Sequence, residues 1–147
     1  MPRRLTTKRR DGYVEHLAAV PLFSACSKKD LELVAKRADD VKVDAGAQLV
    51  AEGATGTEFF VVVEGTATVS RRGKRVATIG PGGFFGDLAL LDRAPRNATV
   101  TADTPMELVV LGQREFSSLL EEVHGFAHKL LVGLAGRLRE ADTQALQ

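Results

Sequence analysis

The sequence has little of several features that mark particular classes of protein. Its 147 residues include one cysteine, Cys26, which excludes an internal disulfide and fits a reducing compartment. The formal net charge is only +1, so no strong overall field draws the chain to nucleic acid or to a membrane surface. No apolar run approaches the roughly 20 residues of a membrane span, and the N-terminus lacks the apolar core of a secretory signal. We therefore expect a cytoplasmic location and a function that depends on a local site.

The composition, with 44% hydrophobic and 27% charged residues, predicts one compact domain with a real core. We place this domain at residues 13–143. The preceding residues 1–12 form a basic tail, because the first ten residues hold five cations and no acidic residue. Such a tail is either a flexible, solvated terminus or a contact for an anionic partner such as nucleic acid or lipid headgroups.

Residues 13–40 show a helical period in two pieces that Pro21 separates. Val14 and Leu17 lie on the apolar face of the first piece, and Leu31 and Val34 lie on that of the second. Ser27 is a suitable N-cap for the second piece, followed by an acidic residue in the first turn. A helix from about Ser27 to Ala38 is therefore predicted.

The region 41–112 changes to a period of two, with short β-branched runs that alternate with glycines. This pattern predicts a meander of short strands that closes into a small barrel or sandwich. The predicted strands are Val41–Val43, Gln48–Val50, Phe59–Val63, Thr66–Ser70, Arg75–Ile79, Ala98–Thr101 and Glu107–Leu111.

The helical period returns over residues 113–143, as one helix or as two helices with a break near Val123–Gly125. Glycines inside this segment each cost roughly 1 kcal/mol relative to alanine, so its apolar stripe must be covered. The cover could be the barrel, a second copy of the chain, or a ligand that joins barrel and helix.

The segment Pro81–Val100 breaks the strand pattern and carries the residues best suited to bind an anion. We expect Phe85–Asp92 to form a helical turn, whose free backbone amides attract anions. Arg96, fixed by the preceding proline, can give two parallel hydrogen bonds to phosphate oxygens. Asp87 is an acceptor suited to a sugar hydroxyl, so together these residues indicate a nucleotide.

The glycine spacing alone does not decide this interpretation. A glycine-rich turn is common, an Arg–Asp pair can be merely structural, and the dinucleotide fingerprint would need glycine where Phe85 stands.

The run GDLALLDRAPRNATV closely resembles the phosphate-binding cassette of the cyclic nucleotide-binding domain family, usually F-G-E-L-A-L, a short spacer and P-R-x-A-T. The chain is thus similar to the barrels of the catabolite activator protein and of protein kinase A regulatory subunits, over about residues 14 to 140. Further matching segments, in order, are Val20–Ser24, Asp30–Leu31, Glu52–Gly53, Phe59–Val62 and Glu64–Gly65.

The resemblance implies a mainly β fold with flanking helices. This is an eight-stranded jelly-roll (double-stranded β-helix) barrel with N-terminal helices and a C-terminal helical lid, which binds cAMP or cGMP without any cofactor or metal. Arg96 would bind the cyclic phosphate, together with the amides of Gly86, Leu88 and Ala89 and the adjoining Asn97 and Ala98. Asp87 would hold the ribose 2′-hydroxyl. Arg137 would lie over the purine as the last helix closes on the ligand.

Two residues depart from the family pattern. Asp87 stands where members usually carry glutamate, and losing a hydrogen bond to a charged group would cost about 1.5–3 kcal/mol of affinity. Asn97 stands where cAMP-preferring relatives tend to have alanine or serine and cGMP-preferring ones threonine. cAMP is therefore the expected ligand, while Asn97 leaves the base preference open.

Several other functions compete with that of a cyclic nucleotide receptor. His124 and His128 are spaced like two zinc ligands, but Gly125 stands where a zinc protease needs its glutamate, so we expect no enzyme. A barrel that lost nucleotide affinity would act as a protein interaction module instead. Residues 113–147 leave no room for a helix-turn-helix reader, so nucleic acid is not an expected partner. The apolar stripe suits a homodimer, and the effector protein is unknown.

Overall fold

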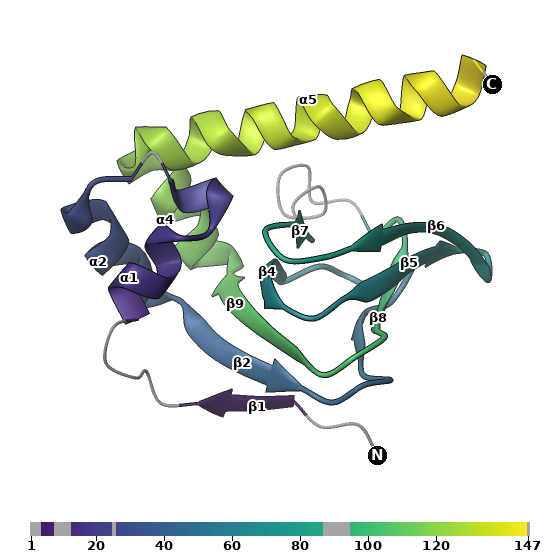
Figure 1. The fold of residues 1–147 in the computed structure, drawn as a ribbon, viewed down its shortest axis with the longest axis horizontal. Coiled ribbons are helices and arrows are strands. Elements are labelled where there is room, and N and C mark those ends of the chain that lie inside the picture. Colours follow the sequence, from purple (N-terminus) through teal and green to yellow (C-terminus); the bar gives the residue numbers. More distant parts are fainter. Residues whose placement is uncertain (1–3, 8–12, 25, 87–94, 147) are drawn as a thin grey trace.

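The computed structural model describes residues 4–7, 13–24, 26–86 and 95–146 (Figure 1). Within these ranges, nine strands form two antiparallel sheets, with helices before and after them. One sheet has the order β1-β2-β9-β4-β7 and the other the order β3-β8-β5-β6. The strands are β1 Arg4–Thr7, β2 Asp39–Val43, β3 Gln48–Val50, β4 Glu58–Glu64, β5 Ala67–Arg71, β6 Lys74–Ile79, β7 Phe84–Phe85, β8 Thr99–Ala102 and β9 Met106–Gly112.

Strands β2 to β9 are the eight strands of a jelly-roll, four in each sheet, so the predicted fold class is confirmed. All seven strands read from the alternating pattern are present, within two residues of the predicted ends. Strand β1 was not predicted. It comes from the segment expected to be a flexible tail and pairs antiparallel with β2, with Arg4 opposite Val43. Strand β7 was also missed, and it contains Phe85, which was expected to open a helical turn.

Strand β4 separates the two hydrophobic clusters of the molecule. Successive side chains of a strand point to opposite faces. Phe59 and Val61 therefore pack among the helices, whereas Phe60 and Val62 face the barrel interior. Both faces of this strand are buried, which explains its continuous apolar run.

The N-terminal helices are α1 (Tyr13–Ala18), the 3-10 turn η1 (Pro21–Phe23) and α2 (Lys28–Arg37). The predicted start of α2 is confirmed. The Ser27 hydroxyl accepts from the Asp30 amide at 3.1 Å, and the Asp30 carboxylate accepts from the Ser27 amide at 3.1 Å.

Burial, with a smaller contribution from the Asp30 carboxylate, raises the pKa of the Cys26 thiol to about 11. Cys26 therefore stays a neutral thiol at neutral pH.

The C-terminal segment forms α4 (Gln113–Glu122) and α5 (His124–Leu146), with the predicted break at Val123. The start of α5 is anchored by Phe126, whose ring lies 5.9 Å from those of Phe23 and Phe116 and 6.1 Å from that of Phe59. Helix α5 then extends across the barrel above β7 and β6 (Figure 1).

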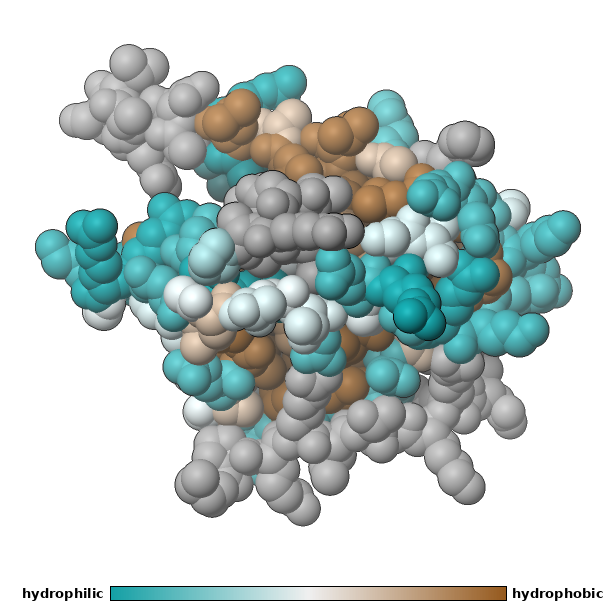
Figure 2. Space-filling view, turned by 180° about the vertical axis from the view of Figure 1, so that it is seen from behind, coloured by the Kyte–Doolittle hydropathy of each residue, from teal (hydrophilic) through white to brown (hydrophobic). Residues whose placement is uncertain are grey.

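Helix α5 carries exposed apolar side chains. Leu131 and Leu138 are each 66% exposed and Val132 is 55% exposed. Figure 2 shows hydrophobic residues gathered along the edge of the molecule where this helix lies. Across the described ranges no helix is long and apolar enough to cross a bilayer.

Candidate functional site

Arg96 is a buried cation at the entrance to β8. Only 7% of the residue is exposed. Its Nη1 donates to the carbonyl oxygen of Gly86 and its Nη2 to that of Glu58, both at 2.8 Å. Two backbone carbonyls from different segments therefore fix the direction of the guanidinium plane. A buried cation held in this way keeps its charge and its geometry for an anion.

Gly86 is required at this position for two reasons. Its φ is +89°, a conformation that residues with a Cβ rarely adopt. A Cβ atom here would also lie 2.6 Å from the Glu58 carbonyl oxygen and 2.8 Å from Arg96 Nη1. Gly86 follows β7, whose Phe85 pairs with Phe60 of β4, so the sheet brings Gly86 next to Glu58. The close contact of three segments at Arg96 therefore depends on this glycine.

The backbone of Arg96 is held on both sides by the loop that follows β3. The Arg96 amide donates to the Ala54 carbonyl at 2.8 Å, and the Gly53 amide donates to the Arg96 carbonyl at 2.7 Å. Gly53 itself has a φ of +82°. The Glu52–Gly53 pair noted in the sequence thus lies beside Arg96, which sequence spacing alone does not show.

The other predicted ligand-binding residues differ in their exposure and in whether the structure describes them. Asn97 is exposed and its carbonyl oxygen accepts from Arg71 Nε at 3.0 Å, whereas Ala98 is buried. Asp87, Leu88 and Ala89 lie outside the described residues, as does the rest of the predicted helical turn up to Asp92.

Arg137 lies on α5 and contacts β7. Its Nη2 donates to the Phe84 carbonyl oxygen, and its guanidinium carbon lies 4.3 Å from the centre of the Phe84 ring. One turn earlier, a Cβ on Gly133 would lie 2.6 Å from the tip of the same ring. Gly133 and Arg137 therefore both contact Phe84, which lies two residues before Gly86 in the sequence. We call this contact the Phe84 clasp.

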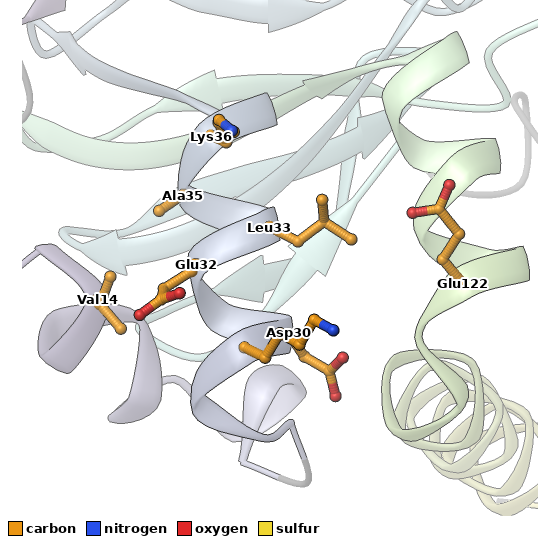
Figure 3. A pocket seen from close by; sticks show the side chains of 8 residues that line it. Val14, Asp30, Glu32, Leu33, Ala35, Lys36 and Glu122 are labelled. Atoms are coloured by element: carbon orange, nitrogen blue, oxygen red, sulfur yellow. The ribbon is translucent and has the colours of Figure 1, made fainter.

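In the part of the chain that the structure describes, no group of three or more His, Cys, Asp or Glu side chains is placed to hold a metal. A hollow of about 680 Å³ lies between α2 and the end of α4 (Figure 3). Its lining includes the apolar residues Leu33 and Ala35 and the charged residues Lys29, Asp30 and Glu122. None of the residues around Arg96 lines it.

Comparison with known proteins assigns the family. The pattern described as the cyclic nucleotide-binding domain matches residues 40–123, a range that contains Gly86 and Arg96. The chain therefore belongs to the cyclic nucleotide-binding domain family, as the resemblance of the cassette predicted.

Curated relatives show which members of this family the chain resembles. The chain is 37% identical over 117 residues to the cAMP-dependent protein kinase regulatory subunit of Eremothecium gossypii, which covers 79% of this chain and 26% of that protein. The chain thus spans about a quarter of the length of this curated relative. It is related to cAMP-binding regulatory subunits of protein kinase A.

Solved structures support the same relationship. The regulatory domain of Toxoplasma gondii PKA, crystallised with cAMP, has a TM-score of 0.68 and 34% identity, and the alignment covers 76% of this chain and 46% of that chain. A cyclic nucleotide-binding domain from Methylobacillus flagellatus has a TM-score of 0.84 with 22% identity, covering 97% and 88% of the two chains. At that identity the second match shows the fold alone.

Proposed function

We propose that the chain is a receptor module for a cyclic nucleotide, with cAMP as its ligand and Arg96 as the residue that binds the cyclic phosphate. The observation that carries the proposal is the buried guanidinium of Arg96, held at 2.8 Å by the carbonyls of Gly86 and Glu58. Family membership and relatives named for cAMP support the choice of ligand. Binding and release of a small ligand require no catalytic group, so the proposed role is regulatory rather than enzymatic.

In this proposal the phosphate meets a cation whose orientation is already set. Ligand binding then loses little free energy to side-chain ordering, because the Arg96 fork is held before the ligand arrives. The amides of Gly86, Leu88 and Ala89 complete the phosphate cradle, and Asn97 and Ala98 flank it. The Asp87 carboxylate accepts from the ribose 2′-hydroxyl, with a reach one methylene shorter than the family's usual glutamate.

Helix α5 is the proposed responding element. The ligand-linked change moves the Phe85–Leu91 segment toward the phosphate and repositions α5 over the base, with Arg137 on that helix. The Phe84 clasp supports this coupling, because it joins α5 directly to the strand that leads into Gly86. Hydrogen exchange that is equal in both segments with and without ligand would contradict the coupling.

The competing proposal is a barrel that serves as a protein interaction module without nucleotide affinity. The observation in its favour is Asp87, which shortens the acceptor expected to hold the ribose. A second copy of the chain at the apolar face of α5 and an effector protein are proposed partners under either function. The two functions differ in whether any cyclic nucleotide binds.

Titration calorimetry with cAMP, cGMP and 5′-AMP separates the two proposals. We expect cAMP to bind the wild type, 5′-AMP to bind far more weakly, and Arg96→Ala to lose at least about thirtyfold in affinity, because a buried charge pair is removed. Arg96→Lys keeps the charge without the fork and should bind with intermediate affinity. Arg75→Ala, which removes an exposed cation from β6, is the matched control. No heat with either cyclic nucleotide at millimolar concentration would refute the receptor proposal.

A further inference from the structure

The tip of the β5–β6 hairpin reaches across to the Arg96 segment. Its turn residues Arg72 and Gly73 have positive φ values of 52° and 78°, as in the tight turns that connect twisted strands. The β5–β8 ladder ends where Ser70 pairs with Thr99. Beyond that point the Arg71 side chain connects the two segments, because its Nε donates to the Asn97 carbonyl oxygen at 3.0 Å. A side chain of the hairpin thus fixes the residue directly after Arg96.

Glu52 joins the same hairpin to the other side of Arg96. Its carboxylate accepts from the Arg72 amide at 3.0 Å, and its own amide donates to the Thr99 hydroxyl at 3.0 Å. The next two residues, Gly53 and Ala54, make the two backbone hydrogen bonds that hold Arg96. The hairpin tip therefore supports the Arg96 backbone from both directions. We call the contacts of Arg71 and Arg72 with Asn97 and Glu52 the hairpin bracket.

We propose that Arg71 and Glu52 are positioning residues of the anion site, which act through the backbone of residues 53–54 and 96–97. The inference rests on the proposed function and gives a role to two residues that lie outside the cassette. Arginine has a long side chain, so a small shift of its backbone moves the guanidinium away from the Gly86 and Glu58 carbonyls. A misplacement of a binding group by about 1 Å is enough to lower affinity or rate strongly.

The hairpin contains its own control. Arg71, Arg72, Lys74 and Arg75 are all exposed, so a general basic patch is the simple alternative to a bracket. Arg75 instead donates to the Thr78 hydroxyl on its own strand, whereas the hydrogen bonds to Asn97 and Glu52 come from Arg71 and Arg72. Arg75→Ala therefore removes the same charge from the same hairpin and leaves the bracket intact.

The ligand experiment compares Arg71→Ala and Glu52→Ala with Arg75→Ala. We expect the two bracket variants to lose about fivefold in affinity for cAMP and for cGMP, and Arg75→Ala to lose less than about twofold. The ratio of the two affinities should stay unchanged, because the bracket acts on the phosphate side. The loss of affinity should persist at high salt, because salt would screen a long-range electrostatic effect of the removed charge on the ligand. Glu52→Gln should restore affinity, since its amide oxygen still accepts from Arg72.

A ligand-free measurement separates failure of the bracket from failure of the proposed function. In Arg71→Ala the amides of Gly53 and Arg96 should exchange with solvent several-fold faster than in the wild type and in Arg75→Ala, while the unfolding temperature stays the same. Unchanged exchange overturns the bracket, even when the wild type binds cAMP. Faster exchange supports it, even when no nucleotide binds and the receptor proposal fails. Equal affinity losses in Arg71→Ala and Arg75→Ala would also overturn it.

Discussion

At the scale of single residues, the candidate site depends on the close contact between Arg96 and Gly86. Arg96 was identified from its sequence neighbours, and the structure places it at the meeting point of β4, β7 and β8. Gly86 contributes through its lack of a side chain, which admits the Arg96 guanidinium and the Glu58 carbonyl at close range. The sequence motif names both residues, but the carbonyl of Glu58 has no sequence signature because any residue supplies one.

Replacing Gly86 with alanine should destabilise the fold more than replacing another glycine of similar conformation. Gly86→Ala combines a positive φ with overlap against the Glu58 carbonyl, so the free energy of unfolding should fall by about 2–4 kcal/mol. Gly73→Ala, at φ +78° with nothing within 4 Å of the new Cβ, should lose only about 1 kcal/mol. Urea unfolding measures both. Equal losses would show that the contact with Glu58 and Arg96 is not tight.

At the scale of elements, helix α5 packs closely against the barrel at one of its glycines, Gly133. The sequence treats Gly133 and Gly136 alike, as glycines that weaken a helix. The structure separates them, because a Cβ at Gly133 would meet the Phe84 ring and one at Gly136 meets nothing within 4 Å. Gly133 is thus a packing residue of the Phe84 clasp, whereas Gly136 has no such role.

The two glycines should respond oppositely to alanine. Gly136→Ala should raise the free energy of unfolding by roughly 0.5–1 kcal/mol, because alanine favours the helix. Gly133→Ala gains the same propensity but overpacks against Phe84, which is itself buried against Phe59. It should be less stable than Gly136→Ala by about 1–3 kcal/mol. Thermal unfolding and hydrogen exchange of α5 test this, and two equally stabilised variants would rule out the clasp.

At the scale of the whole molecule, helix α5 leaves apolar side chains uncovered on the side that faces away from the barrel. The sequence pattern predicts that the entire stripe needs a cover. Phe126 and Leu130 are buried, whereas Leu131 and Leu138 on the same stripe are each 66% exposed. The rest of the molecule therefore covers one face of the helix, which includes Phe126, Leu130 and Gly133, and Leu131 and Leu138 lie off that face. The rest of the stripe is available to a second copy of the chain.

Sedimentation equilibrium should show a concentration-dependent species of twice the 15.8 kDa of the chain. Leu131 and Leu138 lie seven residues apart and so on the same face of the helix. The double variant Leu131→Glu, Leu138→Glu should be monomeric, because burying two carboxylates at such a face is costly. Leu33→Ser, in the hollow between α2 and α4, is the control and should leave the association unchanged. A wild type that stays monomeric at the highest concentration contradicts a dimer.

Local sequence patterns predict seven of the strands, the capped start of α2, the break near Val123 and Arg96 as the candidate anion-binding residue. These features depend on local patterns, namely alternation, capping geometry and a short motif, which a single segment carries. Strand β7 is two residues long, and β1 forms only because β2 offers an edge, so neither has a local signal.

The distant groups that support the candidate site are visible only once the chain is folded. The contacts of Arg96 with Gly86 and Glu58, of Arg71 with Asn97, and of Gly133 with Phe84 join residues 10 to 49 positions apart. Such contacts are set by how the two sheets and the last helix pack together. Backbone carbonyls and exposed arginines become specific only through that packing, because their chemistry is common to the whole chain.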